Sequence, residues 1–88
     1  MKKVYFEKGC YKKYQRLVSK NKILKQQIKK CLERLSLDPA HPSLRLHKLV
    51  GRKRVAWSAS INMSLRLIFQ FKEDGIFIID IGKHEEVY

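Results

Sequence analysis

The chain has 88 residues, enough for one small hydrophobic core, so we expect a single domain over residues 1–88. Its 20 Lys and Arg against 8 Asp and Glu give a formal net charge of +12, which favours polyanionic partners such as nucleic acid, ribosomes or an acidic protein. The longest apolar run, Ile76–Ile79, is too short to span a membrane, and no stretch resembles a signal peptide. We therefore expect a cytoplasmic protein with no membrane segment.

The first half of the chain predicts a short strand and two helices. Lys2–Phe6 is compatible with a strand, and apolar residues then recur at helical spacing from about Glu7 to Lys20. A second helix is expected from about Lys22 to Leu37, ended by Pro39 because the residue before a proline disfavours helical conformation. The short link between them predicts an antiparallel hairpin whose apolar faces cover a sheet.

Residues 55–88 predict three consecutive antiparallel strands followed by a polar tail. The segments Val55–Ile61 and Leu65–Lys72 alternate apolar and polar side chains, the pattern of half-buried strands. Ile76–Ile81 is apolar at nearly every position, as expected of a covered or central strand. The fold class is therefore α+β with the order β-α-α-β-β-β, a helical hairpin on one face of a small antiparallel sheet.

The turns predict the register. A three-residue loop at Asn62–Ser64 places Trp57 opposite Phe69, whereas a two-residue loop would mix the two faces. A similar loop at Glu73–Gly75 predicts these pairs: Phe71 with Phe77, Phe69 with Ile79, Leu67 with Ile81 and Arg66 with Gly82. One face is then apolar, and the other carries Ser58, Ser60, Arg66, Gln70 and Asp80. Arg66 lies within diagonal reach of both Asp80 and His84, so we place the chemistry on this polar face.

Metal and cofactor chemistry is not indicated. The histidines are scattered, the glycines are isolated, and Cys10 and Cys31 have no partners at metal-ligand or CxxC spacing. We therefore expect no metal and no small-molecule cofactor. The two cysteines could face each other across the helical hairpin, but the favoured interpretation is simply two reduced, buried thiols.

The remaining polar residues suit RNA cleavage without a metal. A ribose 2′-hydroxyl can attack its adjacent phosphate when a base, a cation and an acid are in place. His84, Arg66 and His47 supply these side-chain types. The alternatives are an ordinary exposed His84, an Arg66 paired with Asp80 and a His47 without a role. Tyr88 is either a base-stacking platform or a packing residue of the tail.

A basic stretch accompanies these residues. From Pro39 to Lys72 there are seven Lys and Arg and no acidic residue. Such one-sided charge is typical of a nucleic-acid contact rather than of a solvated loop. The expected phosphate-binding residues are Arg45, Lys48, Arg52, Lys53 and Arg54.

Three segments carry a resemblance to a known family. They are HPSLRLHKLVG (His41–Gly51), WSASINMSLRLIF (Trp57–Phe69) and IIDIGKHEEVY (Ile78–Tyr88). With the element order, they resemble the RelE/ParE toxin superfamily, specifically the RelE/StbE and YafQ-like branch of type II toxin–antitoxin systems. The resemblance implies an endoribonuclease that cuts mRNA in the ribosomal A site without a metal and is silenced by a cognate antitoxin.

The resemblance also implies residue roles. His84 corresponds to the C-terminal catalytic histidine, a general acid, and Tyr88 to the aromatic residue that contacts the substrate. Arg66 corresponds to the arginine that stabilises the transition state, and His47 to the upstream histidine of the YafQ-like branch. Ile61 and Leu65 stand where that branch has a further histidine and an acidic residue, which is compatible with weakened activity.

The charge predicts an acidic antitoxin that folds over the helices or over the polar face of the sheet. Two other functions remain open on the sequence. One is a ParE-like toxin that inhibits DNA gyrase without nuclease activity, and the other is a non-catalytic RNA-binding or ribosome-binding module.

Overall fold

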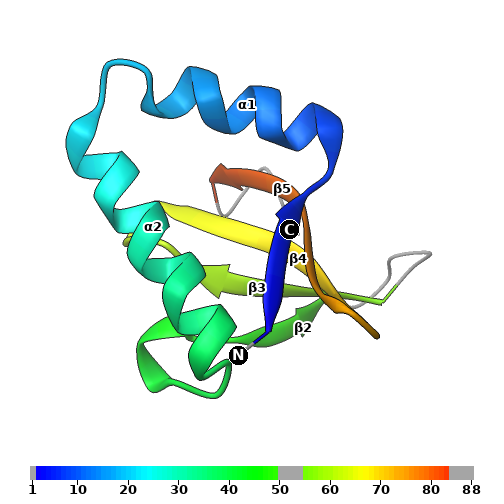
Figure 1. The fold of residues 1–88 in the computed structure, drawn as a ribbon. Coiled ribbons are helices and arrows are strands. Elements are labelled where there is room, and N and C mark those ends of the chain that lie inside the picture. The colour runs from blue at the N-terminus through cyan, green and yellow to red at the C-terminus, as the bar shows by residue number, and fades with distance from the viewer. Residues whose placement is uncertain (1, 50–54, 84–88) are drawn as a thin grey trace.

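Two helices pack on one face of a five-stranded sheet in the computed structural model, which describes residues 2–49 and 55–83 (Figure 1). The strand order in the sheet is β1-β5-β4-β3-β2. The predicted α+β class is confirmed. In chain order the elements are β1 (Lys3–Phe6), α1 (Lys8–Val18), α2 (Lys22–Leu37), the 3₁₀ turn η1 (Pro42–Leu44), β2 (His47–Leu49), β3 (Ala56–Ser60), β4 (Leu65–Lys72) and β5 (Gly75–Lys83).

Side chains cap both helices at their first residues. The Glu7 carboxylate accepts hydrogen bonds from the backbone N–H groups of Gly9 and Cys10, and the Asn21 side chain accepts from Leu24. These bonds satisfy N–H groups that have no partner within the helix. The bounds predicted for α2 are confirmed. The α1 helix is shorter than predicted, because Glu7 is its cap and the last helical residue is Val18.

The sheet is mixed rather than antiparallel. The strand β1 runs parallel to β5, with Lys3 opposite Gly75 and Phe6 opposite Ile78. The pairs β3–β4 and β4–β5 are antiparallel, as predicted, and β2 pairs antiparallel with β3. The three-residue strand β2 adds a fifth member to the four predicted strands.

The register predicted between β3 and β4 is confirmed. Trp57 lies opposite Phe69 and Ala59 opposite Leu67. The Asn62 side chain closes the three-residue loop by accepting from the backbone N–H groups of Ser64 and Leu65, each at 2.8 Å. An asparagine that bonds its own following backbone favours such a turn.

The register predicted between β4 and β5 is wrong near the turn. The connection has two residues, since Lys72 pairs with Gly75, and Phe69 therefore lies opposite Ile78 rather than Ile79. A bulge at Ile79 adds one residue to β5 and restores the predicted pairs of Leu67 with Ile81 and Arg66 with Gly82. Gly75 permits the tight turn, because its φ of 152° is one that residues with a side chain rarely adopt. Glycine is also needed for the close approach of β1, since an added Cβ would lie 2.1 Å from the Lys3 carbonyl oxygen.

The main core lies between the sheet and the helices, on what we call the helix side. Its buried members include Leu35 of α2 and Leu67, Phe69, Ile78 and Ile81 of the sheet. A smaller cluster of Leu49, Ala56 and Ile68, with Ile79 packed against it, lies on the opposite side. The separation follows from strand alternation, because neighbouring residues point to opposite faces.

Cys10 and Cys31 are free and buried in the main core, as predicted. Burial raises the pKa of the Cys10 thiol to about 11 and that of the Cys31 thiol to about 12. Within the described part of the chain, neither helix combines the length and the apolar character that crossing a membrane requires.

Candidate functional site

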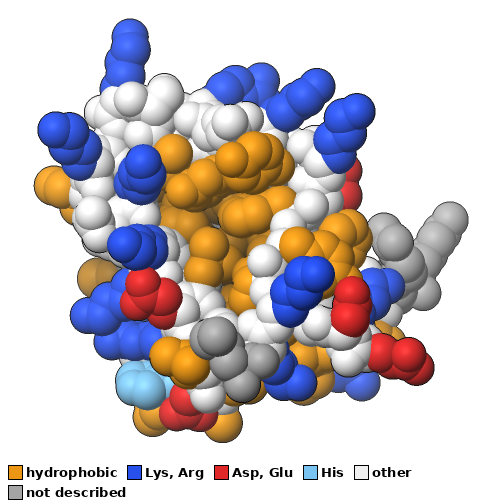
Figure 2. All heavy atoms as spheres, in the orientation of Figure 1, with side chains coloured by type: hydrophobic (Ala, Val, Ile, Leu, Met, Phe, Trp, Pro, Cys, Tyr) orange, Lys and Arg blue, Asp and Glu red, His pale blue; other side chains and the backbone are white. Residues whose placement is uncertain are grey.

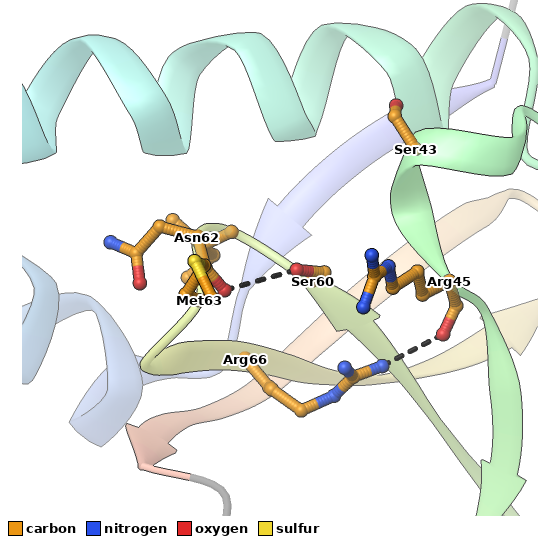
Figure 3. A pocket seen from close by; sticks show the side chains of 7 residues that line it. Ser43, Arg45, Ser60, Asn62, Met63 and Arg66 are labelled. Atoms are coloured by element: carbon orange, nitrogen blue, oxygen red, sulfur yellow. Dashed lines mark hydrogen bonds between the residues drawn. The ribbon is translucent and has the colours of Figure 1, made fainter.

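A pocket of about 430 Å³ lies between η1, the β3–β4 loop and strand β4 (Figure 3). Two arginines and several neutral polar groups face it. Its lining residues are Ser43, Arg45, Ser60, Ile61, Asn62, Met63 and Arg66. We call it the Arg66 pocket. Guanidinium, hydroxyl and amide groups are hydrogen-bond donors, so the pocket suits an anionic ligand.

Two oxygen atoms hold the Arg66 guanidinium. Its Nε donates to the Ser58 hydroxyl. Its Nη2 donates to the Arg45 backbone carbonyl at 2.8 Å, as Figure 3 shows. Ser58 is fully buried, so its hydroxyl has a fixed environment within the sheet. A flexible arginine is thereby restricted to one orientation, which lowers the entropy that it loses on binding a phosphate.

The Arg45 carbonyl is directed at Arg66 by an uncommon backbone conformation. Arg45 ends η1 with φ 44° and ψ 49°, in the left-handed region, and its N–H donates to the Pro42 carbonyl. A non-glycine residue in this region costs about 1 kcal/mol, so the surrounding structure must hold it. Residues of known function frequently occupy such conformations.

The turn that carries Arg45 is anchored to α2. The His41 Nδ1 accepts from the Ser43 backbone N–H at 3.1 Å and so caps η1. Arg34 of α2 donates from Nη1 to the Ser43 hydroxyl at 2.7 Å. The helix, the turn and the arginine of β4 are thus linked by consecutive hydrogen bonds.

The register separates the two predicted site residues of β2. His47 lies opposite Ser58, and therefore on the same side of the sheet as Arg66. Lys48 lies opposite Trp57, on the helix side. The structure therefore places His47, Ser58 and Arg66 together on one side and Lys48 on the other.

Asp80 keeps its predicted register, opposite Ile68, but its carboxylate has a partner other than Arg66. Its carboxylate pairs with Lys13 Nζ of α1 at 3.1 Å and accepts a hydrogen bond from the Ile81 backbone N–H. The change is one of partner and not of register, because Lys13 of α1 brings its ammonium group to this carboxylate. Both partners are partly exposed, so the ion pair adds little to stability.

Five predicted site residues lie outside the described residues: Arg52, Lys53, Arg54, His84 and Tyr88. Two contributors were missed by sequence reasoning. Ser58 was placed on the polar face without a role, although its position one strand from Arg66 was a usable signal. The Arg45 carbonyl had no signal, because nothing in the sequence indicates a left-handed arginine.

The described histidines, cysteines and carboxylates do not gather into any group of three or more that could hold a metal ion. The donors gathered around the Arg66 pocket are instead nitrogen and hydroxyl groups suited to oxyanions.

Comparisons with known proteins extend the description. No protein-family model and no curated protein sequence matches the chain. Among solved structures, a metal-bound toxin from Helicobacter pylori is 25% identical with a TM-score of 0.80, and the match covers 100% of each chain. The YoeB–YefM complex from Staphylococcus aureus is 20% identical with a TM-score of 0.79, over 96% of this chain and 98% of that one. The DinJ–YafQ toxin–antitoxin complex from E. coli is 17% identical with a TM-score of 0.76, over 99% of this chain and 97% of that one. These neighbours are RelE-superfamily type II toxins, and the chain has the fold of that superfamily.

Proposed function

We propose that the chain is the toxin of a type II toxin–antitoxin system and cleaves mRNA on the ribosome. The observation that carries the proposal is the Arg66 pocket, in which buried Ser58 and the Arg45 carbonyl fix a guanidinium on the side of the sheet that also carries His47. The fold supports it, because similar structures are toxins solved in complex with YefM and with DinJ.

The proposed reaction is an internal transfer at phosphorus. The ribose 2′-oxygen loses its proton to a base and bonds to the adjacent phosphorus, and the bond to the 5′-oxygen breaks. An acid protonates the departing 5′-oxygen, which leaves a 2′,3′-cyclic phosphate and a 5′-hydroxyl end. Arg66 stabilises the extra negative charge of the phosphorane, and side chains alone, without a metal, supply the proton transfers.

The proton transfers are assigned to histidines. We assign the acid to His84 and the base to His47, since imidazole is suited to proton transfer near neutral pH. Tyr88 contacts the substrate base. His47 is exposed on β2, on the same side of the sheet as Arg66.

The charge supports RNA as the substrate and an acidic protein as the inhibitor. The net charge of +12 attracts the phosphates of mRNA and of the ribosome, and Arg45, Lys48, Arg52, Lys53 and Arg54 are proposed to bind them. The same charge favours an acidic antitoxin. We place this action in the cytoplasm, where translating ribosomes are found.

Primer extension on a translated mRNA tests the proposal. Wild-type protein is expected to produce new 5′ ends within codons. His84→Ala should produce none and Arg66→Ala far fewer, while both variants still sediment with ribosomes. Blocked DNA supercoiling without mRNA cuts would instead assign the chain to the gyrase inhibitors. Ribosome binding without cuts by any variant would assign it to the non-catalytic modules.

A further inference from the structure

A histidine outside the Arg66 pocket holds the turn that carries Arg45. His41 precedes η1 and is not among the residues that line the pocket, and sequence reasoning gave it no role. Its Nδ1 lies 2.7 Å from the Ser43 hydroxyl oxygen and accepts from the Ser43 backbone N–H at 3.1 Å. Two bonds from one serine therefore converge on a single ring nitrogen.

These bonds define the protonation state of His41. The Ser43 side chain points toward α2, where Arg34 Nη1 donates to its hydroxyl oxygen at 2.7 Å (Figure 3). Because a guanidinium can only donate, the Ser43 oxygen accepts from Arg34, and its own O–H proton is directed to His41. A ring nitrogen that accepts from two donors carries no proton. His41 is therefore neutral in this arrangement, with its single N–H at Nε2.

The position of the Arg45 carbonyl depends on this cap. The turn η1 is only three residues long and ends at Arg45, whose left-handed conformation directs its carbonyl at Arg66 Nη2. Without the His41 acceptor, the Ser43 N–H has no partner in the turn, and Arg45 can relax toward the more favourable right-handed region. The carbonyl then turns away from the guanidinium, which loses one of the groups that orient it.

We propose that neutral His41 is a positioning residue for Arg66, an inference that rests on the proposed function and deepens it. The neutral ring caps η1 and keeps the Arg45 carbonyl in place, so the guanidinium stays directed at the phosphate. A proton on Nδ1 turns this acceptor into a donor and breaks both bonds from Ser43. Imidazole takes up a proton as the pH falls below neutrality. Acid therefore weakens cleavage through this turn, in addition to its effect on the histidines assigned to the proton transfers.

The charged groups around His41 oppose a protonated ring at Ser43. The turn packs against α2 and β3, and β3 has no charged residue. Arg34 of α2 and Arg45 at the end of the turn would repel a second positive charge. Asp38, whose backbone carbonyl accepts from the His41 N–H at 3.0 Å, has the acidic side chain closest along the chain and would compete for it. Lys and Arg also greatly outnumber Asp and Glu on the face in Figure 2, consistent with the net charge of +12.

The test compares single-turnover cleavage by the full chain at about pH 8 and about pH 6. His41→Ala removes the acceptor and should lower the rate about tenfold at the higher pH. His41→Asn keeps an acceptor for the N–H two residues on and cannot take up a proton. It should match wild type within about twofold at the higher pH and exceed it about threefold at the lower one. Asn21→Ala is the matched control, since it removes the side-chain cap of α2 outside the pocket and should leave the rate unchanged.

NMR of the free chain separates this inference from the proposed function, because it requires no cleavage. In wild type the signals of the Arg66 Nε–H and the Ser43 N–H should shift with the same midpoint as the His41 ring, and His41→Asn should abolish these shifts. Coupled shifts in a chain that never cleaves support the positioning role and contradict the nuclease. An Arg66 shift that persists unchanged in His41→Asn overturns the inference. In a chain that cleaves, so does full activity of His41→Ala or an equal acid loss in His41→Asn and wild type.

Discussion

The two sides of the sheet differ in what holds them together. On the helix side, Phe69 and its neighbours are buried among other apolar side chains, so the contacts are non-directional. On the opposite side, Arg66 is held by directional hydrogen bonds to Ser58 and to the Arg45 carbonyl. The strand β4 contributes side chains to both sides of the sheet. Substitutions at neighbouring positions of β4 should therefore affect mainly folding on the helix side and mainly activity on the Arg66 side. Strand alternation thus places the main core on one side of the sheet and the proposed site on the other.

The largest expected effect concerns folding. Phe69→Ala removes a fully buried ring and should lower the free energy of unfolding by about 3–5 kcal/mol. Urea denaturation measures it. Phe71→Ala is the comparison, since Phe71 is 40% exposed and its loss should cost clearly less. Equal losses at the two positions would contradict the assignment of the core.

The next effect concerns activity on the other side of β4. Arg66→Ala should lower the cleavage rate by about 10²–10³, the usual loss for a group that stabilises a transition-state charge, with a small change in melting temperature. Arg66→Lys should restore little, because an ammonium cannot reproduce the planar set of donors. Full activity of Arg66→Lys in single-turnover cleavage would show that a positive charge alone stabilises the transition state, and would contradict the need for the planar guanidinium.

Ser58 acts through Arg66 and is a positioning residue. Ser58→Ala removes the acceptor of the Arg66 Nε hydrogen bond, and we expect about a tenfold lower kcat with little change in KM. In the Arg66→Ala background the same substitution should have almost no further effect on cleavage, since the two residues form one unit. Additive losses in this double-mutant cycle would mean that Ser58 acts independently of Arg66.

Asp80 tests the alternative partner of Arg66. Asp80→Asn breaks an ion pair with Lys13 between partly exposed groups, so stability should change by less than about 1 kcal/mol. Cleavage should stay within about twofold of wild type, because Arg66 is oriented by other groups. A loss as large as that of Ser58→Ala would return Asp80 to the site.

The cysteines are expected to have the smallest effect, a change in the free energy of unfolding that is absent at neutral pH. Their folded pKa values of about 11 and 12 exceed the ordinary value of 9.0, so the unfolded chain loses these protons first as pH rises. The thiols should therefore not change stability below about pH 9 and should lower it increasingly above. Urea denaturation across this range checks the slope, which Cys31→Ala should reduce. An identical slope in that variant would contradict the burial of Cys31.

The sequence allowed much of the fold to be predicted, where alternation was regular. The pairing of Trp57 with Phe69 and the bounds of α2 followed from spacing. The run from Ile76 to Ile79 is apolar on both faces, so its sequence could not reveal the bulge or the two-residue turn. The parallel pairing of β1 depends on the path of the chain across the sheet rather than on any local pattern.

The candidate site was predicted in part. Arg66 was assigned to the correct side of the sheet because the β3–β4 loop fixed its register. The hydrogen bond from Arg66 to the Arg45 carbonyl joins residues that are far apart in the sequence and needs a left-handed residue. The pairing of Lys13 with Asp80 likewise joins α1 to β5. Such contacts depend on tertiary structure and leave no periodic signal.

The most direct test of the central claim is the structure of the chain on a ribosome whose A-site codon carries a 2′-O-methyl group, which prevents cleavage. We expect a phosphate oxygen of this codon to lie within hydrogen-bond distance of the Arg66 guanidinium, with Ser58 still bonded to Nε. A codon bound on the helix side of the sheet, or a guanidinium directed away from the phosphate, would contradict this expectation.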